Sequence, residues 1–117
     1  MCLELNEKSK VKIATKNIVV YKCLKIDKSI NLYTSPYIYS IYEKYNIYTS
    51  KIKINTYLHS YYLYGFINIG LHSCLTRKAA DYHKYNQNYI VVKMIIPKGA
   101  YYIKGNFNEI VSDILIW

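Results

Sequence analysis

The sequence has little of several residue types that define particular protein classes. Its 117 residues include three cysteines, two prolines, four glycines and one tryptophan. The cysteines, Cys2, Cys23 and Cys74, follow no paired spacing, so they indicate reduced thiols inside a cell and exclude a disulfide framework. No flexible linker and no internal repeat is present, so the chain is predicted to be one domain, residues 1–117, with residues 1–16 as a polar N-terminal arm.

Long apolar runs are also missing. The longest candidate, residues 89–97, is interrupted by Lys93 and falls short of the roughly 18 residues that a membrane span requires. The first ten residues carry two glutamates and no apolar stretch, unlike a secretory signal. The sequence therefore predicts a cytoplasmic protein with no membrane partner.

Acidic side chains are scarce. Seven acidic residues against sixteen basic ones give a formal net charge of +9, which favours nucleotides, nucleic acid or acidic proteins as partners. Arg77 is the only arginine, although arginine is the side chain favoured for phosphate and base-edge recognition. Because A/T-rich coding also enriches Lys, Ile, Asn and Tyr, the charge alone does not separate function from codon usage.

What the sequence does contain is a series of β-rich segments around one helix signal. Thr76 can cap a helix over residues 77–85, in which Ala79, Ala80 and Tyr82 are predicted to pack inward. Strands are expected at 17–26, 51–56, 71–75, 89–96, 100–104 and 109–117, with turns at 97–99 and 105–108. Residues 37–48 have the spacing of a short helix and also suit a strand and loop.

This pattern predicts an α+β domain, in which a mainly antiparallel twisted sheet carries the 77–85 helix and leaves room for a second short helix near residues 37–45. Six residues are expected to be buried: Val19, Leu71, Ala79, Val91, Ile95 and Ile114. Aspartate at Val91 or Ile95 is expected to prevent soluble expression, because an unpaired charge in a core is prohibitive.

The strand-to-helix junction is the leading candidate for anion binding. Free N–H groups and the dipole of a helix that starts after Thr76 favour a phosphate, and Arg77 and Lys78 add positive charge. Simple capping by Thr76 is the alternative interpretation. The full set of predicted ligand-binding residues is Lys22, Tyr37, His72, Ser73, Thr76, Arg77, Lys78 and Lys98.

Tyrosine is abundant, with 16 residues and a dense segment at 57–64. Tyr37, Tyr62 and Tyr64 can stack on bases, and such tyrosines can equally be half-buried packing residues.

Groups for catalysis are few. His72 and Cys74 share one face if their segment is a strand, but a nucleophile pair needs a third group that orients the imidazole. Asp81 and His83 follow in the sequence, yet the spacing matches no familiar zinc site. Cys2 has no base nearby in sequence to activate it. No catalytic residue, metal or cofactor is predicted from these groups.

Five short segments carry a resemblance. They are Met1-Cys2-Leu3, YKCL at 21–24, SPY at 35–37, GLHS at 70–73 and IPKGAYY at 96–102. In this order they resemble a group of small proteins common in bacteriophages and mobile elements. The resemblance implies a phage-type accessory protein, with counter-defence as the expected role.

The order of elements also looks like the ADP-ribosyltransferase-like fold. The counterparts are Tyr21-Lys22 on a first strand, Gly70 with Ser73, Ala79 with Tyr82, and Glu109. This similarity implies a transferase in which Glu109 and Ser73 act catalytically and share one cleft with Lys22.

The sequence as a whole predicts a non-catalytic accessory protein that binds a phosphate-containing ligand, either a nucleotide signal or nucleic acid, and that needs no cofactor. One alternative is an inhibitor that binds a host defence protein directly, in the manner of anti-CRISPR proteins. The other is an ADP-ribosyltransferase-like enzyme. A homo-oligomer is expected, since symmetric pairing would enlarge a pocket in so small a chain.

Overall fold

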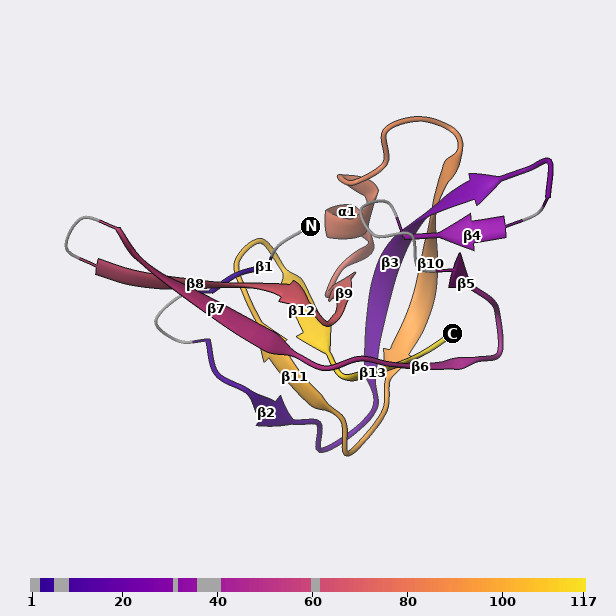
Figure 1. Ribbon diagram of the computed structural model, residues 1–117. Coiled ribbons are helices and arrows are strands. Elements are labelled where there is room, and N and C mark those ends of the chain that lie inside the picture. The colour runs from indigo at the N-terminus through magenta and orange to yellow at the C-terminus, as the bar shows by residue number, and fades with distance from the viewer. Residues whose placement is uncertain (1–2, 6–8, 31, 36–40, 60–61) are drawn as a thin grey trace.

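The computed structural model describes residues 3–5, 9–30, 32–35, 41–59 and 62–117, with the backbone alone for residues 3, 55–59, 62–64, 66 and 68. This part of the chain is mostly antiparallel sheet with a single short helix (Figure 1). The prediction of a mainly antiparallel sheet with one helix is confirmed at that level, and the fold is broadly α+β or mainly β. No helix within the described ranges is long and apolar enough to cross a membrane.

The larger sheet contains the central strands. Its path runs β2 (Lys12–Ile13), β11 (Tyr101–Lys104), β12 (Glu109–Ser112), β9 (Leu71–Cys74), β3 (Ile18–Asp27), β10 (Tyr89–Ile96), β13 (Ile114–Ile116) and β6 (Ile47–Thr49). Two further strands, β4 (Leu32–Thr34) and β5 (Ile41–Tyr42), continue from β3. The prediction that the 17–26 segment is central is confirmed, because β3 lies between β9 and β10.

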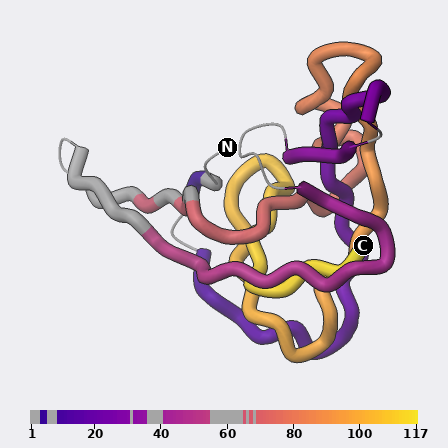
Figure 2. The backbone as a smooth tube through the Cα atoms, turned by 45° about the vertical axis from the view of Figure 1, so that its right-hand side comes forward, coloured from indigo at the N-terminus to yellow at the C-terminus, as the bar shows by residue number. Residues whose placement is uncertain are grey.

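A smaller sheet projects from this body. It consists of β1 (Leu3–Glu4), β8 (Tyr62–Ile69) and β7 (Lys53–His59), and the β7–β8 hairpin extends away from the larger sheet (Figure 1). The segment from β6 into the start of β7 runs from the larger sheet toward the smaller one (Figure 2). The N-terminal arm adds β1 to the edge of this sheet and β2 to the edge of the larger one. The arm therefore pairs at sheet edges.

The core lies on the inner face of β3 and β10. These two strands pair over eight residues, from Tyr89 opposite Lys25 to Ile96 opposite Ile18. Their β-branched composition suits such a pairing. Alternation places Val20, Leu24, Met94 and Ile96 on one face, where each is at most 1% exposed. Burying each of these side chains contributes about 1.5–3 kcal/mol to folding.

The same alternation corrects several of the burial predictions. Val19 is 42% exposed, because it projects from the opposite face to Val20. Val91 and Ile95 lie opposite Cys23 and Val19 on that outer side and are only partly buried. Leu71 is buried as predicted, whereas Ala79 and Ile114 are partly buried. The side chains of β10 that an aspartate would disrupt most are therefore Met94 and Ile96.

The C-terminal segment is not one strand. β12 pairs with β9 and β11, whereas β13 pairs with β10 and β6. The break falls at Asp113, whose Oδ1 accepts a hydrogen bond from the Tyr101 N–H at 2.9 Å. β11 likewise does not return along β10 but pairs with β12 and β2. After β10 and again at Asp113, the chain leaves one set of neighbouring strands and pairs with another.

The helix predictions also need correction. Residues 41–42 and 47–49 are strands joined by a turn in which Tyr45 has a φ of 67°, so the second helix is wrong there, and residues 36–40 lie outside the described chain. α1 spans Arg77–Asp81 and is shorter than predicted. Within α1, Ala80 is fully buried. Tyr82 is the C-cap residue of the helix and is 89% exposed instead of packed inward.

Candidate functional site

β3 and β10 present an outer face that alternates tyrosine and lysine. The register pairs Tyr21 with Lys93 and Lys25 with Tyr89. Directly opposed residues of antiparallel strands project to the same side, so these four side chains share one surface. We define the outer face as the side chains of Val19, Tyr21, Cys23, Lys25, Tyr89, Val91, Lys93 and Ile95.

The helix α1 lies against this outer face and brings the only arginine to it. It packs on β3, β9 and β10 through the buried Ala80. The guanidinium carbon of Arg77 lies 5.1 Å from the centre of the Tyr21 ring. This distance is that of a cation–π contact, which contributes about 0.5–1 kcal/mol at an exposed site. Arg77 is therefore held over the outer face, with its guanidinium exposed to a ligand.

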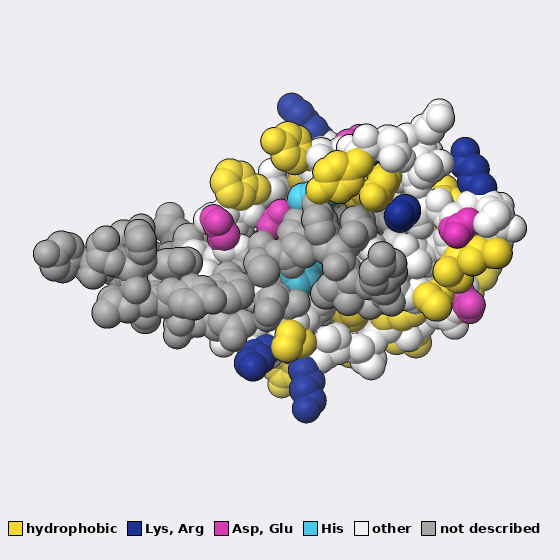
Figure 3. Space-filling view, turned by 45° about the horizontal axis from the view of Figure 1, so that its top comes forward, with side chains coloured by type: hydrophobic (Ala, Val, Ile, Leu, Met, Phe, Trp, Pro, Cys, Tyr) yellow, Lys and Arg dark blue, Asp and Glu magenta, His cyan; other side chains and the backbone are white. Residues whose placement is uncertain are grey.

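Further aromatic rings border the outer face beyond the end of α1. Tyr85 is 66% exposed and contacts Tyr89 edge-on at 5.5 Å between ring centres. Lys25 and Lys93 are exposed, whereas Tyr21 and Tyr89 are half-buried. Figure 3, which brings the upper end of Figure 1 forward, shows exposed hydrophobic side chains and separate Lys and Arg side chains on that side of the molecule. The surface thus offers cations and aromatic rings in alternation.

Three acidic groups lie near this surface. Asp27 follows Lys25 by two residues at the end of β3, is exposed and interacts electrostatically with Lys25. Asp81 is 3.9 Å from the Lys84 ammonium, and both side chains are exposed. Glu109 is 3.5 Å from His83 Nε2. Burial raises the pKa of Glu109 and lowers the pKa of His83, so each is shifted toward its neutral form. We therefore describe the His83–Glu109 contact as a polar contact, not as a permanent ion pair.

Lys22, a predicted ligand residue, is not on the outer face. Its side chain points to the core and is 6% exposed. Its Nζ donates to the His72 carbonyl oxygen at 2.5 Å and lies 5.1 Å from the centre of the Tyr42 ring. Burial lowers the pKa of this amine to about 8, while the neighbouring thiols of Cys74 and Cys23 oppose the change.

The side chains of Ser73 and His72, which are consecutive residues of β9, project to opposite sides of that strand. Ser73 shares the inner face with Lys22, is 2% exposed, and its Oγ has no hydrogen-bond partner among the described residues. The His72 ring lies on the opposite side of β9, with Nε2 3.0 Å from the Ile67 carbonyl oxygen and Nδ1 3.1 Å from that of Gly70. Burial lowers the pKa of His72. His72 thus ties β9 to β8 and is not presented to a ligand.

The helix start behaves as a cap. Thr76 Oγ1 accepts a hydrogen bond from the Ala79 N–H at 3.1 Å, which is the capping alternative to an anion site. With only five residues, α1 has too little aligned backbone for its dipole to hold a phosphate. Arg77 contributes to the outer face and Lys78 is exposed nearby.

Replacing Thr76 by alanine should therefore lower the free energy of unfolding by about 1 kcal/mol, the usual cost of a lost N-cap. Chemical denaturation of the two proteins measures it. Thr76→Ser, which keeps the hydroxyl, is the control and should retain most of the stability. Equal losses in both variants would contradict the capping role.

The remaining predicted residues lie apart. Lys98 sits in the turn after β10, at the opposite end of that strand from Tyr89, and its N–H donates to Asn17 Oδ1 at 2.9 Å. Tyr37 lies outside the described residues, as do the side chains of Tyr62 and Tyr64. The predicted ligand set therefore does not form one site.

The transferase arrangement does not assemble either. Cys74 lies opposite both Tyr21 and Glu109, so Glu109 shares their side of the sheet. Ser73 and Lys22, one residue away on their strands, project to the other side. The sheet itself separates Glu109 from the two residues with which it would share a cleft.

The Cys74 thiol is poorly suited to nucleophilic chemistry. It is 3% exposed, and burial with Glu109 nearby raises its pKa to about 11, so it stays protonated at neutral pH. His72 and Cys74 do project from the same side of β9, as predicted, yet both imidazole nitrogens of His72 face carbonyl oxygens. The described part of the chain contains no cluster of three or more His, Cys, Asp or Glu residues that could hold a metal.

Sequence reasoning missed four residues of the outer face: Tyr21, Lys25, Tyr89 and Lys93. The signal was present, because a tyrosine and a lysine lie four residues apart in each segment, Tyr21 with Lys25 and Tyr89 with Lys93. Lys22 and Lys25 are three residues apart, so a strand sends them to opposite faces. The register between the two strands, which pairs each tyrosine with a lysine, is not visible in either segment alone.

Comparison with protein-family models, with curated protein sequences and with solved structures found no match to this chain.

Proposed function

We propose that the protein binds single-stranded nucleic acid on the outer face of β3 and β10, without chemistry. The observation that carries the proposal is the cross-strand register, which places Tyr21 opposite Lys93 and Lys25 opposite Tyr89, with the Arg77 guanidinium carbon 5.1 Å from the centre of the Tyr21 ring.

This arrangement supplies the two kinds of contact that a single strand needs. Aromatic rings and guanidinium planes stack on unpaired bases, and each stacked base contributes about 1–3 kcal/mol. Lys25 and Lys93 are exposed beside the rings, where their ammonium groups can contact the backbone phosphates. A duplex hides its base faces and would use only the charges. The outer face is partly covered by α1, and its exposed lysines and rings are spread over two long strands, which suits a polymer better than a single nucleotide.

The proposed binding fits the biological setting implied by the sequence resemblance. A phage-type accessory protein that acts in counter-defence can do so by covering nucleic acid that a host system must recognise. The formal charge of +9 would speed its association with any such polyanion.

The proposal is tested by titrating fluorescein-labelled single-stranded RNA and DNA against the protein at two salt concentrations. Lys93→Glu should weaken binding by about tenfold and reduce the salt dependence, because a phosphate contact is lost. Lys98→Glu carries the same charge change at the far end of β10 and should weaken binding less than twofold. Equal losses in both variants would indicate attraction by net charge alone and would contradict a site on the outer face.

A second pair of variants tests stacking separately from charge. Tyr85→Ala should weaken single-strand binding by about fivefold or more, since an exposed ring beside Tyr89 is removed. Tyr45→Ala removes a tyrosine that is 87% exposed in the β5–β6 turn and should have no effect. Saturation by a mononucleotide or cyclic nucleotide in place of the polymer, or equal affinity for duplex DNA, would overturn the proposal.

A further inference from the structure

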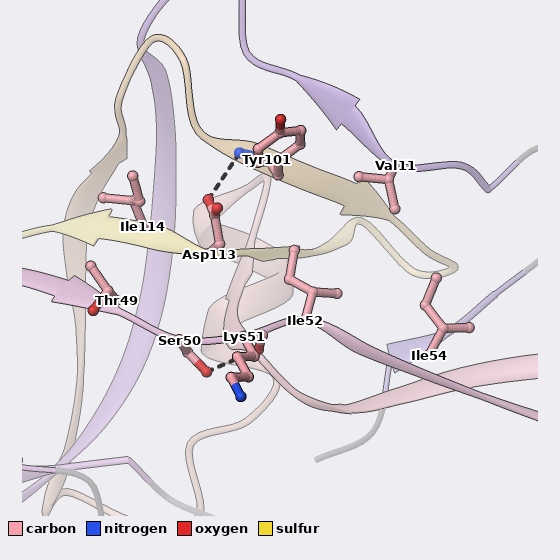
Figure 4. A pocket seen from close by; sticks show the side chains of 9 residues that line it. All are labelled: Val11, Thr49, Ser50, Lys51, Ile52, Ile54, Tyr101, Asp113 and Ile114. Atoms are coloured by element: carbon pink, nitrogen blue, oxygen red, sulfur yellow. Dashed lines mark hydrogen bonds between the residues drawn. The ribbon is translucent and has the colours of Figure 1, made fainter.

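A groove of about 890 Å³ lies away from the outer face, where the two sheets meet (Figure 4). One side is formed by the segment that leads from β6 into β7, and the other by β11 with the residue before β2. Its lining residues are Val11, Thr49, Ser50, Lys51, Ile52, Ile54, Tyr101, Asp113 and Ile114.

The groove is open and largely apolar. Val11, Ile54 and Tyr101 are 47%, 44% and 49% exposed. In Figure 4 these three side chains surround the same open space as Ile52. Ile13, which lies opposite Tyr101 on β2, adds another exposed side chain at 55%. Exposed apolar side chains gathered in one hollow are typical of an interaction site, whereas single ones are ordinary.

Both sheets end at this groove. Among the described strands, β2 pairs only with β11 and β7 pairs only with β8, so each is the last strand of its sheet. An edge strand carries backbone N–H and C=O groups on its unpaired side, and these can hydrogen-bond an added strand. The neighbouring hollow between the two edges provides the side-chain contacts that such an added strand would need.

The charges around the groove indicate which kind of partner it binds. Lys51 lines it, and Lys10, Lys12 and Lys53 are exposed at positions adjacent in sequence to its lining residues. The one carboxylate among the lining residues, that of Asp113, already accepts a hydrogen bond from the Tyr101 N–H. A second copy of this chain carries the same +9 charge and would be repelled. The complementary partner is acidic.

We propose that this groove binds an extended acidic peptide segment of a partner protein, which adds as a strand to an edge that borders the groove. Apolar side chains at alternate positions of the peptide contact Val11, Ile54 and Tyr101. The carboxylates between them reach the lysines. This site is separate from the proposed nucleic-acid surface and does not depend on it.

The experiment uses fluorescence anisotropy of a labelled peptide with alternating glutamate and valine residues, added to the full-length protein. Binding is expected to saturate, and a peptide with alternating lysine and valine should not bind. The same Glu/Val peptide with every backbone amide N-methylated keeps every side chain but loses all backbone donors, and it should bind at least about tenfold more weakly. Absence of saturable binding by the Glu/Val peptide, or equal affinity after N-methylation, would overturn the proposal.

Two protein variants locate the site. Lys51→Glu reverses a charge that lines the groove and should weaken peptide binding by about tenfold. Lys44→Glu makes the same change in the β5–β6 turn, where that lysine contacts only its neighbour Tyr45 among the described rings, and should have no effect. Circular dichroism would verify that both variants fold. Equal losses in the two variants would refute binding at the groove.

Cross-tests keep this proposal apart from the nucleic-acid proposal. Lys93→Glu should leave peptide affinity unchanged, and Lys51→Glu should leave oligonucleotide affinity unchanged. If an oligonucleotide displaces the peptide, the groove is a general anion surface and the peptide proposal is wrong. A protein that dimerises through Tyr101, with dimerisation blocked by Tyr101→Glu, would instead make a second copy the occupant.

Discussion

Replacing Gly70 by alanine is expected to lower the free energy of unfolding by about 3 kcal/mol. Gly70 connects β8 of the smaller sheet to β9 of the larger one, with a φ of 146° that side-chain-bearing residues rarely adopt. A Cβ at this position would lie 2.3 Å from Cγ1 of Val111, a side chain that is fully buried. Backbone strain and overpacking therefore act together.

Gly99 provides the matched control. Its φ is 92°, and a Cβ there would meet nothing within 4 Å. Gly99→Ala should cost only the backbone strain, about 1 kcal/mol. Urea denaturation of both variants gives the difference, which measures the steric part at Gly70. Combining Gly70→Ala with Val111→Ala should cost less than the sum of the two single changes, because the second change removes the clashing methyl group. Additive costs would show that Val111 is not the obstacle.

Replacing Lys22 by methionine is expected to stabilise the protein most near pH 7 and progressively less as the pH rises. The folded protein lowers the pKa of Lys22 from 10.5 to about 8, because the buried amine is desolvated. Between these values the unfolded chain holds a proton that the folded protein has released, so stability rises with pH in that window. The difference between the two pKa values corresponds to about 3 kcal/mol in the free energy of unfolding of the wild type. The uncharged methionine side chain makes no pH-dependent contribution.

The measurement is the free energy of unfolding of both proteins from pH 7 to pH 10.5. The advantage of Lys22→Met over the wild type should be constant below about pH 8 and shrink by about 3 kcal/mol at the upper limit. Groups that do not interact with Lys22 are present in both proteins and cancel in the difference. The thiols of Cys23 and Cys74 do interact with Lys22, so the comparison is made with both cysteines replaced by alanine. Lys25→Met replaces an exposed lysine on the same strand. Its free energy of unfolding should change with pH in parallel with that of the wild type. A pH-independent advantage would contradict a buried, desolvated amine.

Local chemistry accounts for the elements that the sequence predicted well. The run of β-branched residues at 89–96 gives β10 with the predicted bounds, and the Thr76 hydroxyl marks the start of α1. The turn at 105–108 also forms, between β11 and β12. These features depend on neighbours within a few residues, so they can be predicted from short stretches of sequence.

Long-range pairing accounts for what was predicted wrongly. The 37–48 segment has helical spacing, but β5 pairs with β4, and β6 pairs with β13 more than sixty residues later in the chain. The C-terminal run, residues 109–117, is predicted as one strand, yet it divides at Asp113 because its two halves pair with different strands. Tertiary contacts override local preference in both cases.

Long-range pairing also decided which residues are candidates for binding a ligand. Composition and strand periodicity determined that the protein is basic, rich in tyrosine and built around β3 and β10. Only the tertiary structure decided that Lys22 faces the core while Lys25 and Lys93 face outward, and that Arg77 lies over Tyr21. A shift of one residue in strand register would exchange these faces, and the register is set by pairing between segments about seventy residues apart.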